Sequence, residues 1–153
     1  PNTIDFSEAT YLSNGGVLDR LHGFGCWQKP SGEALVVRFM PAVCEHWILQ
    51  LCNRWQENLD VYEDGQGYIT KFTARYEDDG SVLAVIADRD PGVGGNWIDA
   101  FEHETGVFSL RLIQTEGAPP VEIFPVSLDV LEQQGLSALE GVAPIRSGGP
   151  SES

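Results

Sequence analysis

The sequence predicts an all-β fold, an antiparallel β-sandwich of jelly-roll type with a short C-terminal helix. Short stretches of alternating apolar and polar residues recur at intervals of roughly ten residues, a spacing typical of sandwiches. Glycine and proline turns separate these stretches. A chain of 153 residues is long enough to enclose one hydrophobic core. We therefore expect a single domain over residues 1–141 and a flexible tail over residues 142–153.

The N-terminal part carries turn signals rather than a strand pattern. An Asn-Gly-Gly run at 14–16 and a Gly-Phe-Gly run at 23–25 bracket a segment that contains Leu18, Leu21 and His22. The spacing of these three side chains predicts one or two helical turns before the first strand.

Two alternating runs follow, one at 34–40 that ends before Pro41 and one at 46–54. Proline cannot donate to a sheet ladder, so Pro41 is a natural end for the first run. Residues two apart in a strand share a face, so one apolar set from each run should point into the core. The residues expected there are Leu35, Val37 and Phe39 from the first run and Trp47, Leu49 and Leu51 from the second.

The alternating run 67–76 and the apolar run 81–88 flank a tight Asp-Asp-Gly turn that ends at Gly80. We expect these two runs to pair as a β-hairpin, because a short turn with glycine between two strand-like runs is the usual hairpin signal. A further strand is expected over 105–114, where apolar and polar residues alternate again.

The C-terminal part begins with a proline pair at Pro119-Pro120, and residues 121–126 are apolar enough for one more strand. Ser127 can then cap the start of a short helix, since its hydroxyl can accept from a free backbone amide of the first turn. Gly135 should end this helix, because glycine adopts the left-handed conformation of a helix end without strain.

Charge and composition exclude several classes of function. The formal net charge is −14, from 9 Lys and Arg against 23 Asp and Glu, and it repels phosphate backbones and anionic lipids. Neither nucleic acid nor a membrane is therefore an expected partner, and no apolar run approaches the ~20 residues of a membrane-spanning helix. The 3 cysteines have no regular spacing, which predicts no disulfide framework and favours a cytoplasmic location. The N-terminus lacks both the features of a signal peptide and an initiator Met, so a trimmed chain, a piece of a longer protein and export all stay open.

The segment from Arg89 to Asp99 is the most distinctive connection in the chain. It holds a Pro-Gly pair, a Gly-Gly pair, Trp97 and several charges between two strand patterns. Long connections on rigid β scaffolds often carry binding sites. Within it, Asp90 can accept from a backbone amide, Pro91 fixes φ and Gly92 allows a positive φ, so these residues should hold the loop in shape.

The runs Glu33–Asn53 and Val82–Arg111 carry motifs in an order that also occurs in a known family. The motifs are Glu33-Ala34-Leu35-Val36, His46-Trp47, Gln50-Leu51, Asn53-Arg54-Trp55, Leu59-Asp60, Ala87-Asp88-Arg89-Asp90-Pro91-Gly92, Asn96-Trp97-Ile98-Asp99, His103, Gly106 and Arg111. In these motifs the chain resembles the DUF1214 family, which often forms the C-terminal half of larger proteins whose N-terminal half is DUF1254. The resemblance implies a jelly-roll-like fold and an N-terminal partner domain, and it implies no activity. The chain departs from the family pattern at Gly94-Gly95, which adds a residue, at Leu112, where the family often has Trp, and at Glu57 and Asn58.

Two histidines are candidates for general acid and base catalysis. His103 lies among the carboxylates of Asp99, Glu102 and Glu104, which can orient an imidazole and raise its pKa. His46 lies at the start of a predicted strand, where it could face the same mouth of the sandwich and take a proton from a substrate. The alternative for His103 is a solvated side chain that caps a turn.

Arginines are the candidates for binding an anionic ligand. Arg54 and Arg111 lie on predicted strands and Arg89 ends one, although the chain has only 9 cations. A guanidinium presents a fork suited to a carboxylate. Asn96 and Trp97 of the neighbouring loop would complete the ligand-binding set. The alternatives are internal ion pairs of these arginines with Asp60, Asp88, Asp90 or Asp99, and a core-packing role for the tryptophans.

No metal site or cofactor is expected. Cys44, His46 and Cys52 share one strand face, but the two cysteines would lie roughly 26 Å apart if the strand is extended. The spacings CxxC and HxH are absent from the sequence. His22 and Cys26 could join such a site only from elsewhere in the chain. A nucleophilic Cys44 beside His46 is a weaker alternative than a buried structural thiol.

Two functions follow from these patterns. The first is a small-molecule site at one mouth of the sandwich, either binding only or acting as a lyase, isomerase or hydrolase on a small organic, anionic substrate with His103 or His46 as base. The second is a non-catalytic binding or assembly module, in which an exposed sheet face pairs with a second copy or a partner domain. The two histidines decide between them: a shared concave pocket favours the first function, whereas separate, solvated histidines with a large apolar patch outside favour the second.

Overall fold

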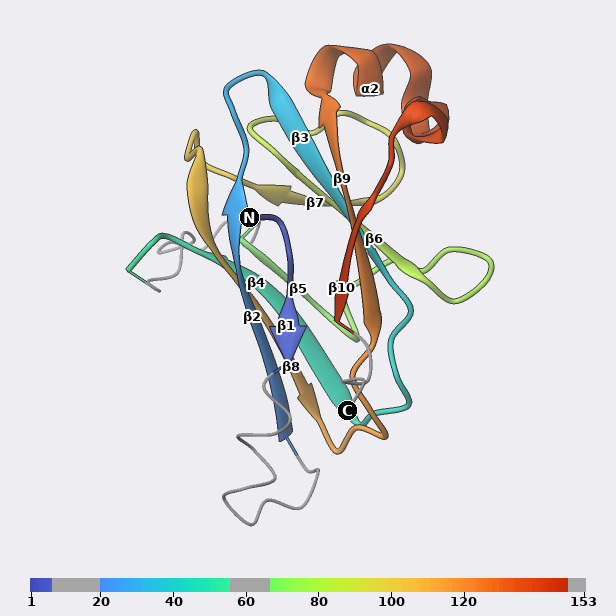
Figure 1. The fold of residues 1–153 in the computed structure, drawn as a ribbon. Helices are drawn as coiled ribbons and strands as arrows, with labels where there is room; N and C mark the ends of the chain where they lie inside the picture. Colours follow the sequence, from blue (N-terminus) through green and yellow to red (C-terminus); the bar gives the residue numbers. More distant parts are fainter. Residues whose placement is uncertain (7–19, 56–66, 149–153) are drawn as a thin grey trace.

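The computed structural model describes residues 1–6, 20–55 and 67–148. These residues form two five-stranded sheets with a hydrophobic core between them (Figure 1). The expected all-β sandwich with a short C-terminal helix is therefore confirmed. Its jelly-roll type stays a prediction.

The first sheet has the strand order β1-β2-β8-β4-β5, and all its neighbouring strands are antiparallel. Its central strand β8 pairs with β2 on one side and with β4 on the other, each over at least seven residues, so it fixes the register of the whole sheet. The strands are β1 (Asp5–Phe6), β2 (Arg20–Gln28), β8 (Thr105–Ile113), β4 (His46–Cys52) and β5 (Tyr68–Thr70).

The second sheet has the order β10-β9-β3-β6-β7. Its pairs are antiparallel except for β6 and β7, which are parallel, so the expected purely antiparallel pairing has one exception. The strands are β10 (Ile145–Gly148), β9 (Pro120–Ser127), β3 (Glu33–Phe39), β6 (Val82–Ala87) and β7 (Asn96–Asp99).

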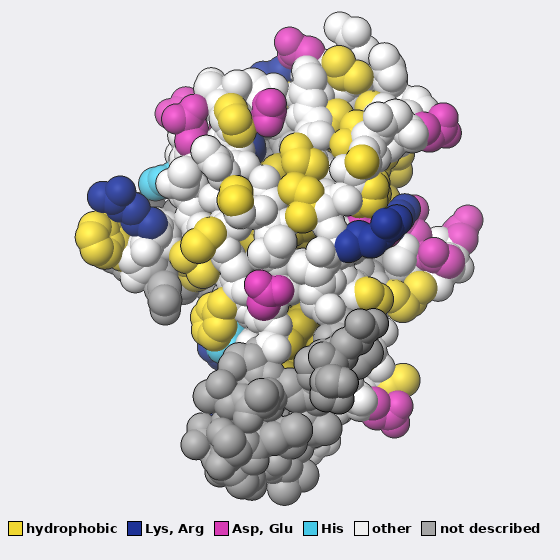
Figure 2. Space-filling model, viewed as in Figure 1, with side chains coloured by type: hydrophobic (Ala, Val, Ile, Leu, Met, Phe, Trp, Pro, Cys, Tyr) yellow, Lys and Arg dark blue, Asp and Glu magenta, His cyan; other side chains and the backbone are white. Residues whose placement is uncertain are grey.

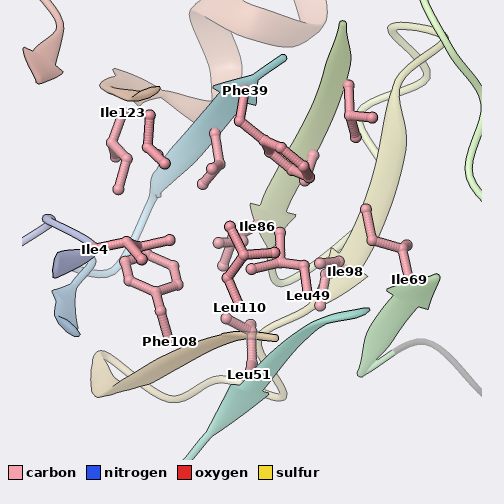
Figure 3. Packing of buried hydrophobic residues seen from close by; sticks show 14 of the residues in the cluster. Ile4, Phe39, Leu49, Leu51, Ile69, Ile86, Ile98, Phe108, Leu110 and Ile123 are labelled. Atoms are coloured by element: carbon pink, nitrogen blue, oxygen red, sulfur yellow. The ribbon is translucent and has the colours of Figure 1, made fainter. Parts of the chain in front are cut away.

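Apolar side chains from the inner faces of both sheets meet in the main core (Figure 3). The predicted inward sets of β3 and β4 are confirmed: all six side chains are buried there. Figure 3 shows Phe39 of β3 on one side of this core and Leu49 and Leu51 of β4 on the other. Phe108 and Leu110 of β8 lie opposite Leu51 and Leu49 in the register of the first sheet.

Two helical segments among the described residues cover part of the outer face of the second sheet. Helix α2 (Leu128–Gln134) begins after Ser127, whose hydroxyl accepts from the backbone amide of Val130, and Gly135 ends it, as the sequence predicts. A 3₁₀ helix (Gly135–Gly141) follows, and both pack on outward side chains of β3, β6 and β9 in a second apolar cluster. In Figure 1 α2 lies at one end of the molecule beside β3 and β9. The second sheet is thus buried on both faces where the helices cover it, whereas the outward side chains of the first sheet, apart from Cys52, are half-buried or exposed.

The hairpin prediction for 67–76 and 81–88 is wrong. Only Tyr68–Thr70 form a strand in the first of these runs, and this strand, β5, pairs with β4 of the first sheet. Strand β6 pairs with β3 and β7 of the second sheet, so the connection at 71–81 crosses between sheets. The physical reason is burial: all six residues of β6 are buried, as in a central strand covered on both faces, and such a strand needs two neighbours.

The helical turn predicted at Leu21 and His22 is also wrong, because both residues lie in β2. Gly23 and Gly25 suggested a turn, but they serve a close approach of chain segments. A Cβ atom at Gly25 would lie 1.5 Å from the carbonyl oxygen of Thr3, and one at Gly23 would meet the ring of Phe6 at 2.6 Å. The predicted turn at 14–16 and the positions Leu18, Glu57, Asn58, Leu59 and Asp60 lie outside the described residues.

The distinctive segment after β6 connects two parallel strands. Residues 88–95 carry the chain from the end of β6 back toward its start, where Asn96 pairs with Ala84 and begins β7 rather than continuing a loop. The predicted corner is confirmed: the carboxylate of Asp90 accepts from the amide of Gly92 at 2.9 Å, and Gly92 has a φ of 72°. This corner helps the chain return toward the start of β6 within eight residues.

The tail predicted over 142–153 contains a strand. Ile145–Gly148 form β10, which pairs with β9 along its whole length. The Ser-Gly-rich sequence gave no alternation to indicate this, because an edge strand is held by backbone hydrogen bonds as well as by apolar side chains. The backbone amide of Ile4 also donates to the hydroxyl of Ser147 at 2.8 Å, which ties this strand to the N-terminal segment.

Candidate functional site

The open face of the first sheet brings four basic side chains together at one end of its central strands. In the register of the sheet, Ile113 of β8 lies between Arg20 of β2 and His46 of β4. Arg111, two residues earlier on β8, lies opposite His22 of β2. We call Arg20, His22, His46 and Arg111 the basic cluster.

Sheet geometry sets the spacing of this cluster. Directly opposite side chains such as His22 and Arg111 have Cβ atoms roughly 5 Å apart. Diagonal neighbours lie roughly 7–8 Å apart, still within reach of long side chains, and Arg111 has this relation to both Arg20 and His46. The sequence-predicted residues His46 and Arg111 are therefore brought together. Arg20 was missed, and His22 had been considered only as a metal ligand.

A pocket of about 540 Å³ opens at this place, lined by Arg20, His22, Arg111 and Ile113. The imidazole of His22 is held in place, since its Nε2 atom shares a hydrogen bond of 2.7 Å with the hydroxyl of Ser109. Its ring also contacts the ring of Phe24, with centroids 3.7 Å apart. Burial, and then the positive charge of Arg111, lower the pKa of His22 from its ordinary value.

The charge of this face is opposite to that of the whole protein. On the outward side of β2, β8, β4 and β5 there is no Asp or Glu, although the chain has 23 of them. The nearest carboxylate on the described strands of this face is Asp5 of the edge strand β1, which lies beside Phe24. Elsewhere Asp and Glu side chains are spread over the surface, as Figure 2 shows for one side of the molecule. An anion that avoids most of this protein can therefore approach the basic cluster.

His46 lies at the edge of the cluster and packs against Phe72. The two rings stack with centroids 5.5 Å apart and an interplanar angle of 17°. Its Nδ1 atom is buried without a hydrogen-bond partner among the described residues. A general base normally has its second nitrogen oriented by such a partner, so His46 lacks one feature of a catalytic histidine.

His103 lies far from this cluster. It is exposed in the connection between β7 and β8. It lies just before Thr105, the first residue of β8, whereas Ile113 is the last. The eight residue steps from Thr105 to Ile113 span roughly 27 Å of extended strand, and Ile113 is the partner of His46. The two predicted catalytic histidines therefore do not share one pocket.

Arg54 and Arg89 also lie apart from the basic cluster. Arg54 is exposed and follows Cys52, the last residue of β4, whereas His46 is the first. Its guanidinium lies 5.1 Å from the ring centroid of Trp55. Arg89 holds helix α2: its guanidinium donates to Glu132, with one bond of 3.1 Å, and to Asp129 at 3.0 Å. The predicted ion pairing of arginines with acids is thus present at Arg89, but its partners come from α2.

Asn96 and Trp97 line a second pocket of about 330 Å³, at the edge where β5 and β7 approach each other. The amide of Asn96 is fully used: it accepts from the backbone amide of Arg75 at 2.7 Å and donates to the carbonyls of Arg75 and Leu83, each at 2.9 Å. Trp97 donates from Nε1 to the carbonyl of Ala87 at 3.0 Å. Both side chains therefore shape this edge rather than belonging to the basic cluster.

Sequence reasoning missed one further charged pair, Lys29 with Asp88. The side chain of Lys29 is 0% exposed, and its ammonium donates to Asp88 at 3.1 Å. The other oxygen of Asp88 accepts from the amide of Glu102. This pair ties the end of β2 to the end of β6, and nothing in the order of residues marks Lys29 as buried.

The described residues contain no group of three His, Cys, Asp or Glu side chains that could hold a metal ion. The three cysteines carry free thiols, and burial raises the pKa of Cys44 and Cys52. Of the helices that the structure describes, none is long and apolar enough to cross a membrane.

Comparisons with known proteins extend the fold but not the chemistry. No family model and no curated protein matches the chain. The crystal structure of an uncharacterised protein from Burkholderia cenocepacia is similar, with a TM-score of 0.74 and 30% identity over 85% of this chain and 36% of that one. A protein from Vibrio parahaemolyticus has a TM-score of 0.53 and 14% identity over 71% of this chain and 30% of that one, a likeness of fold alone. The chain thus spans about a third of the length of the solved structures it resembles, and membership of the DUF1214 family stays a prediction.

Proposed function

We propose that this chain is a binding domain for a small organic dianion, held at the open face of the first sheet by Arg111, Arg20 and His22. The observation that carries the proposal is the gathering of these side chains around one pocket, on a face whose central strands carry no carboxylate. Charge-assisted hydrogen bonds from a guanidinium to a carboxylate are among the strongest that proteins make.

The size and spacing of the pocket support a compact ligand with two acidic groups. Its volume of about 540 Å³ lies within the usual range for small-molecule sites. Arg20 and Arg111 are diagonal neighbours in the sheet, so a short dicarboxylate can reach both. A long polyanion would extend beyond the pocket and be repelled by the protein as a whole, whose net charge is −14.

Binding without catalysis is the form of the proposal that the histidines support. His103 lies beyond the opposite end of β8, and His46 lacks a partner for Nδ1 among the described residues. His46 remains the better placed of the two for acid and base chemistry, because it is a diagonal neighbour of Arg111. A lyase, isomerase or hydrolase acting on the bound anion would have to use His46 or His22. We propose a cytoplasmic location as well, supported by the three free thiols.

The replacement Arg111→Gln tests the site. We expect succinate, a dicarboxylate of the right length, to bind at least tenfold more weakly to this variant, because a hydrogen bond to a charged group contributes about 1.5–3 kcal/mol. Isothermal titration calorimetry measures the effect. Arg89→Gln is the matched control, since it removes the same charge from a guanidinium that is held by α2. Equal losses in both variants would mean that only net charge matters.

The titration of His22 predicts a dependence of binding on pH. Because the pKa of His22 is lowered in the folded protein, the folded state binds fewer protons than the unfolded chain just below pH 6.5, and stability falls as pH falls through that value. A bound dianion favours protonated His22, so the affinity for the dianion should rise as pH falls through the same range. Ethane-1,2-disulfonate is a suitable probe, since its own charge does not change there.

His22→Gln can keep the contact with Ser109 and should flatten this pH profile. The other groups that face His22 are Arg20, Arg111 and, from β1, Asp5 at the edge of the sheet. His46→Gln is the matched control, since it removes the other imidazole of the basic cluster. A profile that stays steep in His22→Gln and flattens in His46→Gln would assign the effect to the wrong histidine.

A second candidate function, an assembly module, rests on an exposed apolar patch. Phe72 is 79% and Val43 70% exposed. Phe72 and Val43 lie on two segments that Lys71 joins, because its ammonium donates to the carbonyl of Cys44 at 2.8 Å. If this patch joins two copies, sedimentation equilibrium will give a dimer that Phe72→Ser dissociates. A monomer at all concentrations would leave this function without support.

A further inference from the structure

The pocket at the sandwich edge has a chemistry different from that of the basic cluster. It lies where β5, the edge strand of the first sheet, approaches β7, the edge strand of the second. Its volume is about 330 Å³, near the lower limit for small-molecule sites. The side chains that matter most among its lining are Tyr68, Thr73, Arg75, Asp90, Asn96 and Trp97.

The positive group of this pocket stands on a rigid base. Asn96, which is buried, binds the backbone of Arg75 through both its amide and its carbonyl. The turn that precedes Arg75 is closed by Thr73, whose hydroxyl accepts from the backbone amide of Thr70 at 3.0 Å. The guanidinium of Arg75 makes no hydrogen bond or ion pair with any residue in the part of the chain that the structure describes. It is therefore available to a ligand, and Asn96 holds the backbone from which it extends.

The negative group of the pocket is fixed as well. One oxygen of Asp90 accepts from the amide of Gly92 at 2.9 Å, which sets the orientation of the carboxylate. Its second oxygen has no hydrogen-bond donor within the described ranges. Arg75 and Asp90 both line the pocket, yet they form no ion pair with each other there. The two opposite charges thus face one small space from separate segments.

A ligand that satisfies both charges must itself carry both. The carboxylate of such a ligand can accept from Arg75, and its ammonium can donate to the second oxygen of Asp90. Tyr68 is 42% exposed and Trp97 is half-buried, so their rings offer apolar contact for a side chain. A simple anion would leave Asp90 unpaired and meet repulsion from it. We infer that this edge pocket binds a free, neutral α-amino acid as a zwitterion.

This site is independent of the proposed dianion site, since no residue lines both pockets. Calorimetric titration with leucine and with two analogues that each keep one charge, 4-methylpentanoate and leucinamide, tests the inference. We expect leucine to bind at least tenfold more tightly than either analogue. Equal affinities for leucine and 4-methylpentanoate, or no binding of leucine, would overturn it, as would a neutral sugar that binds more tightly than leucine.

Asp90→Asn makes the test specific. Asparagine can still accept from the amide of Gly92, so the corner at 90–92 should persist while the charge is lost. The variant should bind leucine no more tightly than 4-methylpentanoate. Asp99→Asn is the matched control, because Asp99 accepts in the same way from the amide of Phe101 at 2.7 Å and does not line the pocket. If Asp99→Asn loses as much affinity as Asp90→Asn, the inference fails.

Arg75→Gln should weaken leucine binding at least tenfold, because the guanidinium is lost. The backbone contacts of residue 75 with Asn96 can remain. Arg111→Gln should leave leucine binding unchanged and weaken only the binding of succinate. Loss of leucine binding in Arg111→Gln would show that one site accounts for both ligands, which contradicts the inference. Melting temperatures of all variants, measured in the same buffer, identify any loss that comes from unfolding.

Discussion

Asp88→Asn is expected to lower the free energy of unfolding by about 3–5 kcal/mol, the usual cost of removing one partner from a buried ion pair. Lys29, whose side chain is 0% exposed, donates to Asp88 at 3.1 Å and has no other partner for its ammonium among the described residues. The variant leaves that positive charge buried without a counter-charge. It also disturbs the bond from the amide of Glu102 to Asp88. Urea unfolding followed by tryptophan fluorescence measures the change.

A double-mutant cycle separates the ion pair from the rest of the site. Lys29→Met fills similar space without charge and leaves Asp88, whose side chain is 28% exposed, in contact with water. We expect Lys29→Met to destabilise the protein less than Asp88→Asn does. The combined Lys29→Met and Asp88→Asn variant should recover part of the loss, because no buried charge remains. Strictly additive losses would show that the two side chains do not interact.

Gly106→Ala is the second replacement with a large expected effect, at the upper end of the roughly 1–3 kcal/mol that overpacking costs. A Cβ atom at this position would lie 2.2 Å from the carbonyl oxygen of Cys52 and 2.5 Å from the ring of Trp27. Strand β8 is paired on both sides, so it cannot move away from β4 and β2 together. Thermal or urea unfolding will show the loss.

Gly117→Ala is the control for that replacement, since a Cβ atom there meets nothing within 4 Å. It should change the free energy of unfolding by no more than a few tenths of a kcal/mol. If Gly106→Ala is as harmless as Gly117→Ala, the close packing of Trp27 against β8 is not as described.

The strands with the clearest alternation were predicted well, because alternation reports which faces are buried. Strands β3, β4 and β8 begin and end within two residues of the predicted runs, and the helix boundaries at Ser127 and Gly135 followed from capping chemistry. Pairing was predicted less well. The alternation of 67–76 and the apolar run 81–88 each indicate a strand but do not identify its partner, and the two runs contribute to different sheets.

The site was predicted only in part, for a similar reason. Strand register brings His46 and Arg111 together, and register depends on pairing that no single strand encodes. The alternation Arg-Leu-His in β2 indicates a shared face for Arg20 and His22, but Gly23 and Gly25 indicate a turn at the same place. The glycines are needed because the N-terminal segment passes close to β2.

His103 and Arg89 illustrate the limits of local charge patterns. The carboxylates around His103 indicated a tuned imidazole, yet His103 is exposed, and Asp99 accepts from a backbone amide in its own turn. Arg89 is engaged by α2, which lies forty residues later in the sequence. Long-range partners of this kind are set by the fold, so a pattern within one segment does not predict them.

The most direct test of the basic cluster follows the arginine side chains themselves during a titration with succinate. The ¹H–¹⁵N resonances of each arginine Nε–H group can be assigned by comparison with single Arg→Gln variants. We predict that the largest and saturable shifts belong to Arg111 and Arg20, with the imidazole signals of His22 moving at the same concentrations. Shifts of the same size at Arg89 and Arg146, or no saturable shift at Arg111, would contradict the proposed function.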